Sequence, residues 1–218
     1  MPELRNIVEG IKCASRLMAQ SRSLLVAISG IDGAGKGYFA SRLVEALRSQ
    51  GLNAVTINID GWLNLPDRRF HRVNAGEHFY HHAIRFEALF GQLVLPLKNT
   101  RSVHLLADFT HETATQYAPH LYSFANVDVI VLEGIFLLKR AFQAYYDVSI
   151  WIECGFDTAL ARAIVRAQEG LAPEETSRAY RQIYFAAQEI HFQRDDPRAA
   201  AAHAVLNDPL LGPVTWTD

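Results

Sequence analysis

The sequence has 218 residues, of which 50% are hydrophobic and 20% are charged, and its formal net charge is −2. This composition excludes a disordered chain, and a charge so close to neutral gives no basic surface for nucleic acid. Two cysteines, Cys13 and Cys154, are too few for a disulfide framework and lack the spacing of a metal site. No signal-peptide pattern and no bilayer-spanning apolar run are present, so we expect a cytoplasmic protein without membrane or nucleic-acid partners.

A helix is predicted first, within residues 1–21, and a strand, a glycine-rich loop and a helix follow in direct succession. The strand is the apolar run that starts at residue 24, and the helix after the loop reaches about residue 50. Glycines let backbone N–H groups surround a phosphate, and the start of the helix adds the positive end of its dipole. We therefore expect a P-loop that binds ATP, with its lysine reaching the β- and γ-phosphates. The loop residues are Gly30, Ile31, Asp32, Gly33, Ala34, Gly35, Lys36 and Gly37.

One position departs from the P-loop pattern. A serine or threonine normally follows the lysine, because its hydroxyl holds Mg²⁺, and here the residue is Gly37. Either the metal is held through water and carboxylates, or it is held poorly. A glycine-rich turn without a ligand is a third interpretation, which the flanking strand and helix disfavour.

A carboxylate follows the second predicted strand, residues 53–59. It belongs to Asp60, and the carboxyl ends of strands in open α/β sheets are where ligands bind. There Asp60 can accept the proton of a substrate hydroxyl or hold Mg²⁺ through water. Asp before Gly is also good turn chemistry, so a turn cap is the alternative, but the location favours function.

Residues 61–79 are rich in charged and aromatic side chains without periodicity, which predicts a long binding loop or lid. Arg68, Arg69 and Arg72 are either phosphate clamps or part of a solvated face. Residues 77–95 are predicted to form a helix that runs into a strand-like end. Three histidines can share a face near its start. Without another metal motif we interpret them as surface or substrate-contacting residues rather than zinc ligands. They are His78, His81 and His82.

Two later strands are each followed by an acidic residue. The first, residues 101–107, precedes Asp108 and Phe109, and a loop to residue 126 is expected after it. This pair either offers a small ligand an acceptor and a stacking ring, or is a strand end with a core ring. The second strand, residues 127–132, is strongly apolar and ends at Glu133. That is a Walker-B arrangement, whose carboxylate orients Mg²⁺, and a simple capping carboxylate is the alternative.

The rest of the chain alternates further helices and strands. In the helix predicted for residues 156–168, Arg162 and Arg166 lie at i and i+4 on one face. They can belong to a lid, about residues 156–195, that neutralises a transferring phosphate, or they can be an exposed charged face. The other predicted elements are a short helix at 136–144, a strand at 147–154, a helix at 174–192, a strand at 203–207 and an irregular tail pinned by Trp216.

This order of elements predicts an α/β fold with a mostly parallel sheet between layers of helices. With a P-loop at its first turn, the expected architecture is the three-layer α/β/α arrangement of a P-loop NTPase. We expect a single kinase domain over residues 1–218.

The motifs together resemble the uridine kinase and phosphoribulokinase family of small-molecule P-loop kinases. The resemblance rests on the P-loop, on Asp60, on the Asp-Phe pair, on the LEGIFLL segment that starts at Leu132, and on the arginine-bearing helix. It implies ATP and Mg²⁺ as cofactors. It also implies roles for individual residues: a catalytic base at Asp60, a metal ligand at Glu133, phosphate binding at Lys36, lid arginines at Arg162 and Arg166, and nucleoside-site residues at Asp108 and Phe109.

We therefore predict an ATP-dependent kinase that phosphorylates a hydroxyl of a small metabolite, with a nucleoside 5′-hydroxyl favoured. A kinase for pantothenate, glycerate or a sugar phosphate is one alternative. A nucleotide-binding regulatory protein with little phosphotransfer is the other, and Gly37 motivates it. The association of copies into a homo-oligomer stays open.

Overall fold

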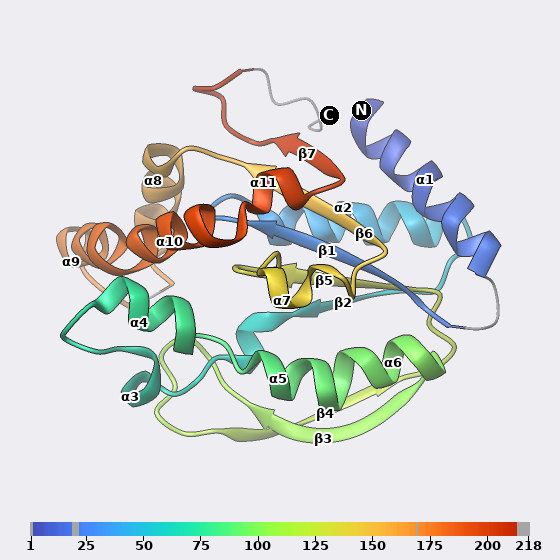
Figure 1. Cartoon of the computed structure of the whole chain (residues 1–218), viewed down its shortest axis with the longest axis horizontal. Helices are drawn as coiled ribbons and strands as arrows, with labels where there is room; N and C mark the ends of the chain where they lie inside the picture. Colours follow the sequence, from blue (N-terminus) through green and yellow to red (C-terminus); the bar gives the residue numbers. More distant parts are fainter. Residues whose placement is uncertain (1, 19–21, 169, 213–218) are drawn as a thin grey trace.

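The computed structural model describes residues 2–18, 22–168 and 170–212, and a wholly parallel five-stranded sheet lies at its centre (Figure 1). The strand order is β2-β5-β1-β6-β7, and every neighbouring pair is parallel. The three-layer α/β/α prediction is confirmed. The strands are β1 (Leu24–Gly30), β2 (Ala54–Asn58), β5 (Val129–Gly134), β6 (Val148–Glu153) and β7 (His203–Leu206).

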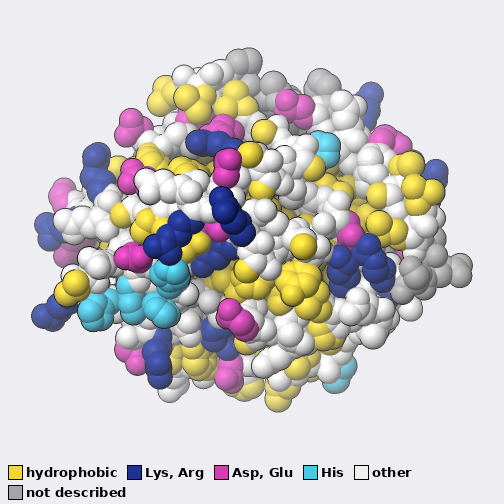
Figure 2. Space-filling view, viewed as in Figure 1, with side chains coloured by type: hydrophobic (Ala, Val, Ile, Leu, Met, Phe, Trp, Pro, Cys, Tyr) yellow, Lys and Arg dark blue, Asp and Glu magenta, His cyan; other side chains and the backbone are white. Residues whose placement is uncertain are grey.

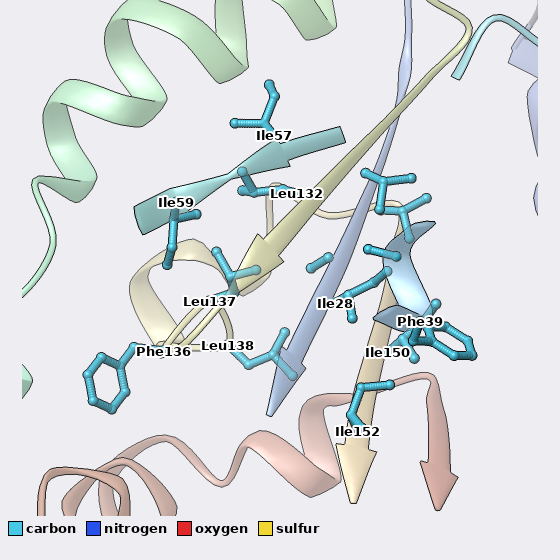
Figure 3. Close-up of a cluster of buried hydrophobic side chains, with 14 of the residues drawn as sticks. Ile28, Phe39, Ile57, Ile59, Leu132, Phe136, Leu137, Leu138, Ile150 and Ile152 are labelled. Atoms are coloured by element: carbon cyan, nitrogen blue, oxygen red, sulfur yellow. The ribbon is translucent and has the colours of Figure 1, made fainter. Parts of the chain in front are cut away.

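The central strands are buried on both faces. Every residue of β1 and β5 is buried, so their sequences LLVAISG and VIVLEG show no alternation between apolar and polar residues. Figure 3 shows that side chains of β1, β5 and β6 share one buried cluster with the turn that follows β5. This core fixes the carboxyl ends of the strands, where ligands bind in such sheets.

Helices flank the sheet, and a separate pair of helices packs together at its carboxyl end. Helix α2 (Lys36–Ser49) packs against β1, β2 and β5, and α1 (Pro2–Met18) packs against α2. Helix α4 (Ala75–His82) packs against α10 (Phe185–Asp195), far away in the sequence (Figure 1). The remaining α-helices are α3 (Pro66–Arg69), α5 (Phe86–Ala88), α6 (Leu95–Thr100), α7 (Arg140–Gln143), α8 (Phe156–Arg166), α9 (Pro173–Ala179) and α11 (Pro197–Ala200).

The predicted loop at residues 108–126 is wrong in its second half. There β4 (Ala118–Phe124) pairs antiparallel with β3 (Val103–Phe109), and this hairpin forms a separate two-stranded sheet. The predicted strand at 101–107 therefore exists but does not join the main sheet. Five of the seven β4 residues are exposed and the strand contains a proline, so its sequence carries little strand signal.

The helix predicted for residues 77–95 is not continuous, because the chain leaves helical geometry at residues 83–85 and resumes it at α5. An antiparallel bridge between Leu63 and Ile84 draws the backbone out of the helix, and Arg85 N–H donates to the Trp62 carbonyl oxygen at 2.9 Å. The strand-like end is π-helical over Leu89–Val94 and α-helical beyond it.

Two other predicted segments differ from the structure in their helical content. The segment 61–79 holds α3 and the start of α4 rather than one long loop. The short helix expected at 136–144 is confined to α7, because Phe136 takes φ +58° and forms a turn before it. Trp216 lies outside the described residues. None of the helices in the described part of the chain is long and apolar enough to cross a membrane.

A buried polar cluster ties α4, α7 and α10 together around Asp195. Its Oδ2 accepts hydrogen bonds from Tyr80 OH at 2.6 Å and contacts His191 Nδ1 at 2.7 Å, and its Oδ1 accepts from Arg140 N–H at 3.0 Å. Burial alone would raise the pKa of Asp195, but the hydrogen bonds from His191, Tyr80 and Arg140 outweigh it and lower this pKa to about 2. The folded state therefore stabilises the ionised carboxylate of Asp195 relative to its protonated form.

We expect Asp195→Asn to lower the free energy of unfolding by about 2–3 kcal/mol at neutral pH, because charge-assisted hydrogen bonds are lost in a buried site. Since the folded pKa lies below the unfolded value of about 3.9, this contribution is present above about pH 4 and is lost as the pH falls towards about 2. Urea denaturation at several pH values measures it. The control is Asp196→Asn, because that exposed residue has φ +46°, which asparagine tolerates. Equal stability of the two variants at neutral pH would contradict the prediction.

Candidate active site

The loop between β1 and α2 has the geometry of a phosphate-binding turn. Gly33 and Gly35 have φ values of +78° and +89°, in the left-handed region that favours glycine. A Cβ on Gly33 would stand 2.6 Å from the Ala159 carbonyl oxygen, and one on Gly35 would stand 2.3 Å from Asn207 Nδ2. The glycines are therefore required both by the turn and by the elements packed against it. Helix α2 begins directly after Gly35, so its free N–H groups face the loop.

Residues just beyond β7 support this loop from outside. Asn207 Nδ2 donates to the Ala34 carbonyl oxygen at 2.7 Å. Asp208 accepts from Gly155 N–H at 2.7 Å and from the Thr158 hydroxyl at 2.7 Å, at the start of α8. Two segments from late in the chain thus fix the position of the loop.

A cleft of about 320 Å³ opens at the loop and brings the main sequence-predicted residues together. The strand register explains this, because Asn58 of β2 pairs with Glu133 of β5, so both strands end level with the loop. The predicted site residues that line the cleft are Asp32, Gly33, Gly35, Lys36, Gly37, Asp60, Glu133 and Arg166.

The cleft concentrates carboxylates around one ammonium group. Burial raises the pKa of Glu133 to about 7. Lys36 opposes this rise, and the negative charges of Asp60 and Asp32 add to it. Burial also raises the pKa of Asp60, again against the effect of Lys36. Lys36 Nζ donates to the Ile31 carbonyl oxygen at 2.9 Å, which keeps the ammonium at the loop. Carboxylates with raised pKa values in a cleft are typical of proton-transfer and cation-binding sites.

The two predicted lid arginines occupy different places. Arg166 lines the cleft, where its Nη2 lies 3.4 Å from Asp32 Oδ1 and donates to Tyr180 OH at 3.1 Å. Tyr180 OH in turn donates to Asp32 Oδ2 at 2.8 Å. Arg162 instead packs behind the loop, with its Nη1 3.5 Å from the Gly33 carbonyl oxygen and 3.6 Å from Cys154 Sγ. The spacing of the arginines in the sequence does not predict that Tyr180 links Arg166 to Asp32.

A second cavity, of about 410 Å³, adjoins the cleft at Asp60. Phe109 lines it and covers Gly61, where a Cβ would stand 2.3 Å from the ring. Asp108 lines neither cavity, and its carbonyl oxygen accepts from Arg85 Nη2 at 2.7 Å. Three residues that line both cavities belong to no sequence motif and were therefore not predicted: Asn58, Glu112 and Gln168.

The predicted histidine group lies apart from both cavities. Figure 2 shows histidines gathered with basic side chains over α4. His78 Nε2 contacts the Arg68 carbonyl oxygen at 2.9 Å, and His81 Nε2 contacts Arg194 Nη1 at 3.0 Å. Across the described ranges, no group of three or more His, Cys, Asp or Glu side chains is arranged to hold a metal ion.

The cleft nevertheless fits Mg²⁺ held jointly by protein and nucleotide. Mg²⁺ prefers oxygen ligands and is usually held by one or two carboxylates together with phosphates and water. Glu133 supplies a carboxylate next to the P-loop, since a Cβ on Gly37 would lie 3.6 Å from Glu133 Oε1. The acidic group therefore stands close to where the P-loop hydroxyl is normally found.

A phosphate-binding loop beside an acidic cleft, at the carboxyl end of a parallel α/β sheet, is typical of the P-loop nucleotide-binding proteins. The chain belongs to the phosphoribulokinase / uridine kinase family, whose family model matches residues 25–170. The chain is thus an enzyme of the ATP-dependent small-molecule kinase class.

Solved structures with the same fold come from several organisms. A possible uridine kinase from Bacillus stearothermophilus aligns with a TM-score of 0.68 at 19% identity, covering 93% of this chain and 98% of that one. A candidate fructose transport system kinase from Silicibacter sp. TM1040 gives 0.69 at 23% identity, covering 92% and 98%. D-glycerate 3-kinase from Cryptococcus neoformans gives 0.65 at 10% identity, covering 99% and 98%. At these identities the likeness extends to the fold alone.

Proposed function

We propose that this chain transfers the γ-phosphate of ATP, with Mg²⁺, to a hydroxyl of a small metabolite, with a nucleoside 5′-hydroxyl as the favoured acceptor. One observation carries the proposal: Lys36, Asp60 and Glu133 line one cleft, and a second cavity begins at Asp60. The nucleotide phosphates belong at the P-loop and the acceptor belongs in the second cavity. Asp60 then stands between donor and acceptor.

Each residue has a role that follows from its place. Asp60 orients the acceptor hydroxyl and accepts its proton as the oxygen attacks phosphorus. Lys36 and the loop N–H groups would hold the phosphates, and Glu133 would hold Mg²⁺, which would neutralise charge on the transferring group. Arg166 belongs to a lid of about residues 156–195. Its guanidinium, which contacts Asp32 in this structure, can release Asp32 and bind the transferring phosphate instead. Arg162 holds the loop carbonyl of Gly33 and so positions the loop.

The direct test is ADP release from purified protein with ATP, Mg²⁺ and single acceptors. The panel contains uridine, cytidine, D-fructose, D-glycerate, pantothenate and ribulose 5-phosphate. ADP release that depends on both the acceptor and Mg²⁺ supports the proposal. Tight ATP binding without metal dependence, and no ADP with any acceptor, would favour the regulatory protein that Gly37 motivates.

We expect Gly37→Ser to lower the Mg²⁺ concentration that gives half-maximal activity by about tenfold, because it restores a hydroxyl ligand. The site accepts the side chain, since the nearest atom to a Cβ is Glu133 Oε1 at 3.6 Å, an ordinary contact. Initial rates at fixed ATP over a Mg²⁺ titration measure it. Gly10→Ser on α1, where a Cβ meets nothing within 4 Å, is the control. An unchanged Mg²⁺ requirement would show that Glu133 already satisfies the metal.

A further inference from the structure

Glu112, in the wall of the second cavity, forms an ion pair with a buried arginine, and the proposed mechanism leaves this pair unused. Arg69, the last residue of α3, is 1% exposed. Its Nη1 lies 3.3 Å from Glu112 Oε1, and its Nη2 donates to the Glu112 carbonyl oxygen. The Nε atom of Arg69 is buried and has no hydrogen-bond partner among the described residues. A buried guanidinium needs a fixed counter-charge, so this pair holds the Glu112 segment in one position.

Glu112 is the member of the pair that reaches the cavities. Its side chain is 22% exposed, and it lines the cleft together with Asp60 and also lines the adjoining cavity. The described residues that line the adjoining cavity include two carboxylates, Asp60 and Glu112, and neither lysine nor arginine. In the cleft, the lysine and the arginine, Lys36 and Arg166, interact with the P-loop residues Ile31 and Asp32. An acceptor in the adjoining cavity therefore lies beside two carboxylates and no lysine or arginine side chain of the lining.

We infer that Glu112 binds the phosphate acceptor and that Arg69 positions Glu112 to do so, which selects acceptors carrying hydroxyl or amino groups over acceptors carrying a carboxylate or phosphate. This inference rests on the proposed function. A carboxylate accepts hydrogen bonds from hydroxyl groups, and it repels an anion that is placed against it. Nucleosides and free sugars fit this wall. Glycerate, pantothenate and sugar phosphates bring a charge of the same sign as Asp60 and Glu112.

One competing arrangement uses the same residues. An anionic acceptor could displace the Glu112 carboxylate and take its place on the Arg69 guanidinium, where Nε is unsatisfied. Such an acceptor would bind more tightly once Glu112 lost its charge. The two arrangements therefore predict opposite responses to Glu112→Gln.

The experiment measures ADP release from wild-type enzyme and Glu112→Gln with the six acceptors named above. For wild type we expect turnover with uridine, cytidine or D-fructose and none with D-glycerate, pantothenate or ribulose 5-phosphate. For Glu112→Gln we expect the acceptor KM to rise by at least about tenfold, while the KM for ATP is unchanged. Glu189→Gln, an exposed residue of α10, is the matched control and should leave both constants unchanged.

Arg69 is tested as a positioning residue. Arg69→Met alone removes the guanidinium that pairs with Glu112 and is expected to lower the melting temperature, and the double variant Arg69→Met/Glu112→Gln should melt closer to wild type. The double variant should keep the raised acceptor KM with an unchanged KM for ATP. A double variant with the wild-type acceptor KM would overturn the role of the pair.

The outcomes separate this inference from the function beneath it. Turnover of an anionic acceptor by wild type, or an acceptor KM for Glu112→Gln within about twofold of wild type, overturns the inference and leaves the kinase assignment standing. Absence of ADP with all six acceptors overturns the proposed function, and the inference with it.

Discussion

Replacing Asp60 by asparagine is expected to lower kcat by about 10²–10⁴-fold, while the affinity for ATP changes little. Asparagine keeps the size of the side chain but cannot accept the proton that leaves the acceptor hydroxyl. The residue lies in the short 3-10 helix Ile59–Trp62 that follows β2, between the P-loop cleft and the adjoining cavity, so the substitution removes the base without removing a wall of either site. Steady-state ADP release and ATP titration by calorimetry measure the two quantities separately.

Asp196→Asn serves as the control here too, because it makes the same change of side chain at an exposed position outside both cavities. A rate for Asp60→Asn close to that of wild type would remove Asp60 from the mechanism. A loss of ATP binding together with rate would instead place Asp60 in the nucleotide site.

Replacing Lys36 by methionine is expected to lower kcat/KM for ATP by about 10²–10³-fold, because the ammonium acts on the phosphate oxygens where charge develops. The ammonium also lowers the pKa values of Asp60 and Glu133, so its loss raises both. The carboxylates act in their ionised form, and activity is lost as the pH falls below their pKa values. The acidic limb of the pH–rate profile should therefore move to higher pH in the variant.

A profile of kcat/KM from about pH 5.5 to about pH 9 measures this shift. Lys12→Met on α1 is the control, because this half-buried lysine lies outside both cavities and its Nζ donates to Gln50 Oε1 at 2.7 Å. A large loss of rate with an unmoved acidic limb would show that Lys36 acts on the phosphate alone and does not set the charge state of the cleft.

The centre of the site was predictable because its functional residues come directly after strands that the local sequence pattern already identifies. Strands β1 and β5 are continuous apolar runs, and each leads directly into its functional residues, so the P-loop and Glu133 could be placed without a structure. Asp60 could be placed for the same reason, since β2 lies beside β5 and ends level with it.

The rest depends on contacts between distant segments, which no local pattern carries. The helix predicted for residues 77–95 is broken by a bridge between Leu63 and Ile84. Strand β4 forms because it pairs with β3, whereas its own residues carry little strand signal. Arg162 and Arg166 share a helix face by spacing, yet one packs behind the loop and the other lines the cleft. Asp32 and Tyr180 are separated by 148 positions and still share a hydrogen bond.

The position of Asn207 has a consequence for folding during translation. A ribosome releases the chain from its N-terminus, so residues 30–37 emerge long before the side chain that donates to Ala34. The nascent polypeptide can form β1 and α2 early, but the nucleotide turn gains its last support only when translation has passed residue 207. We therefore expect the nascent chain to bind a triphosphate at residues 30–37 only after synthesis has passed residue 207.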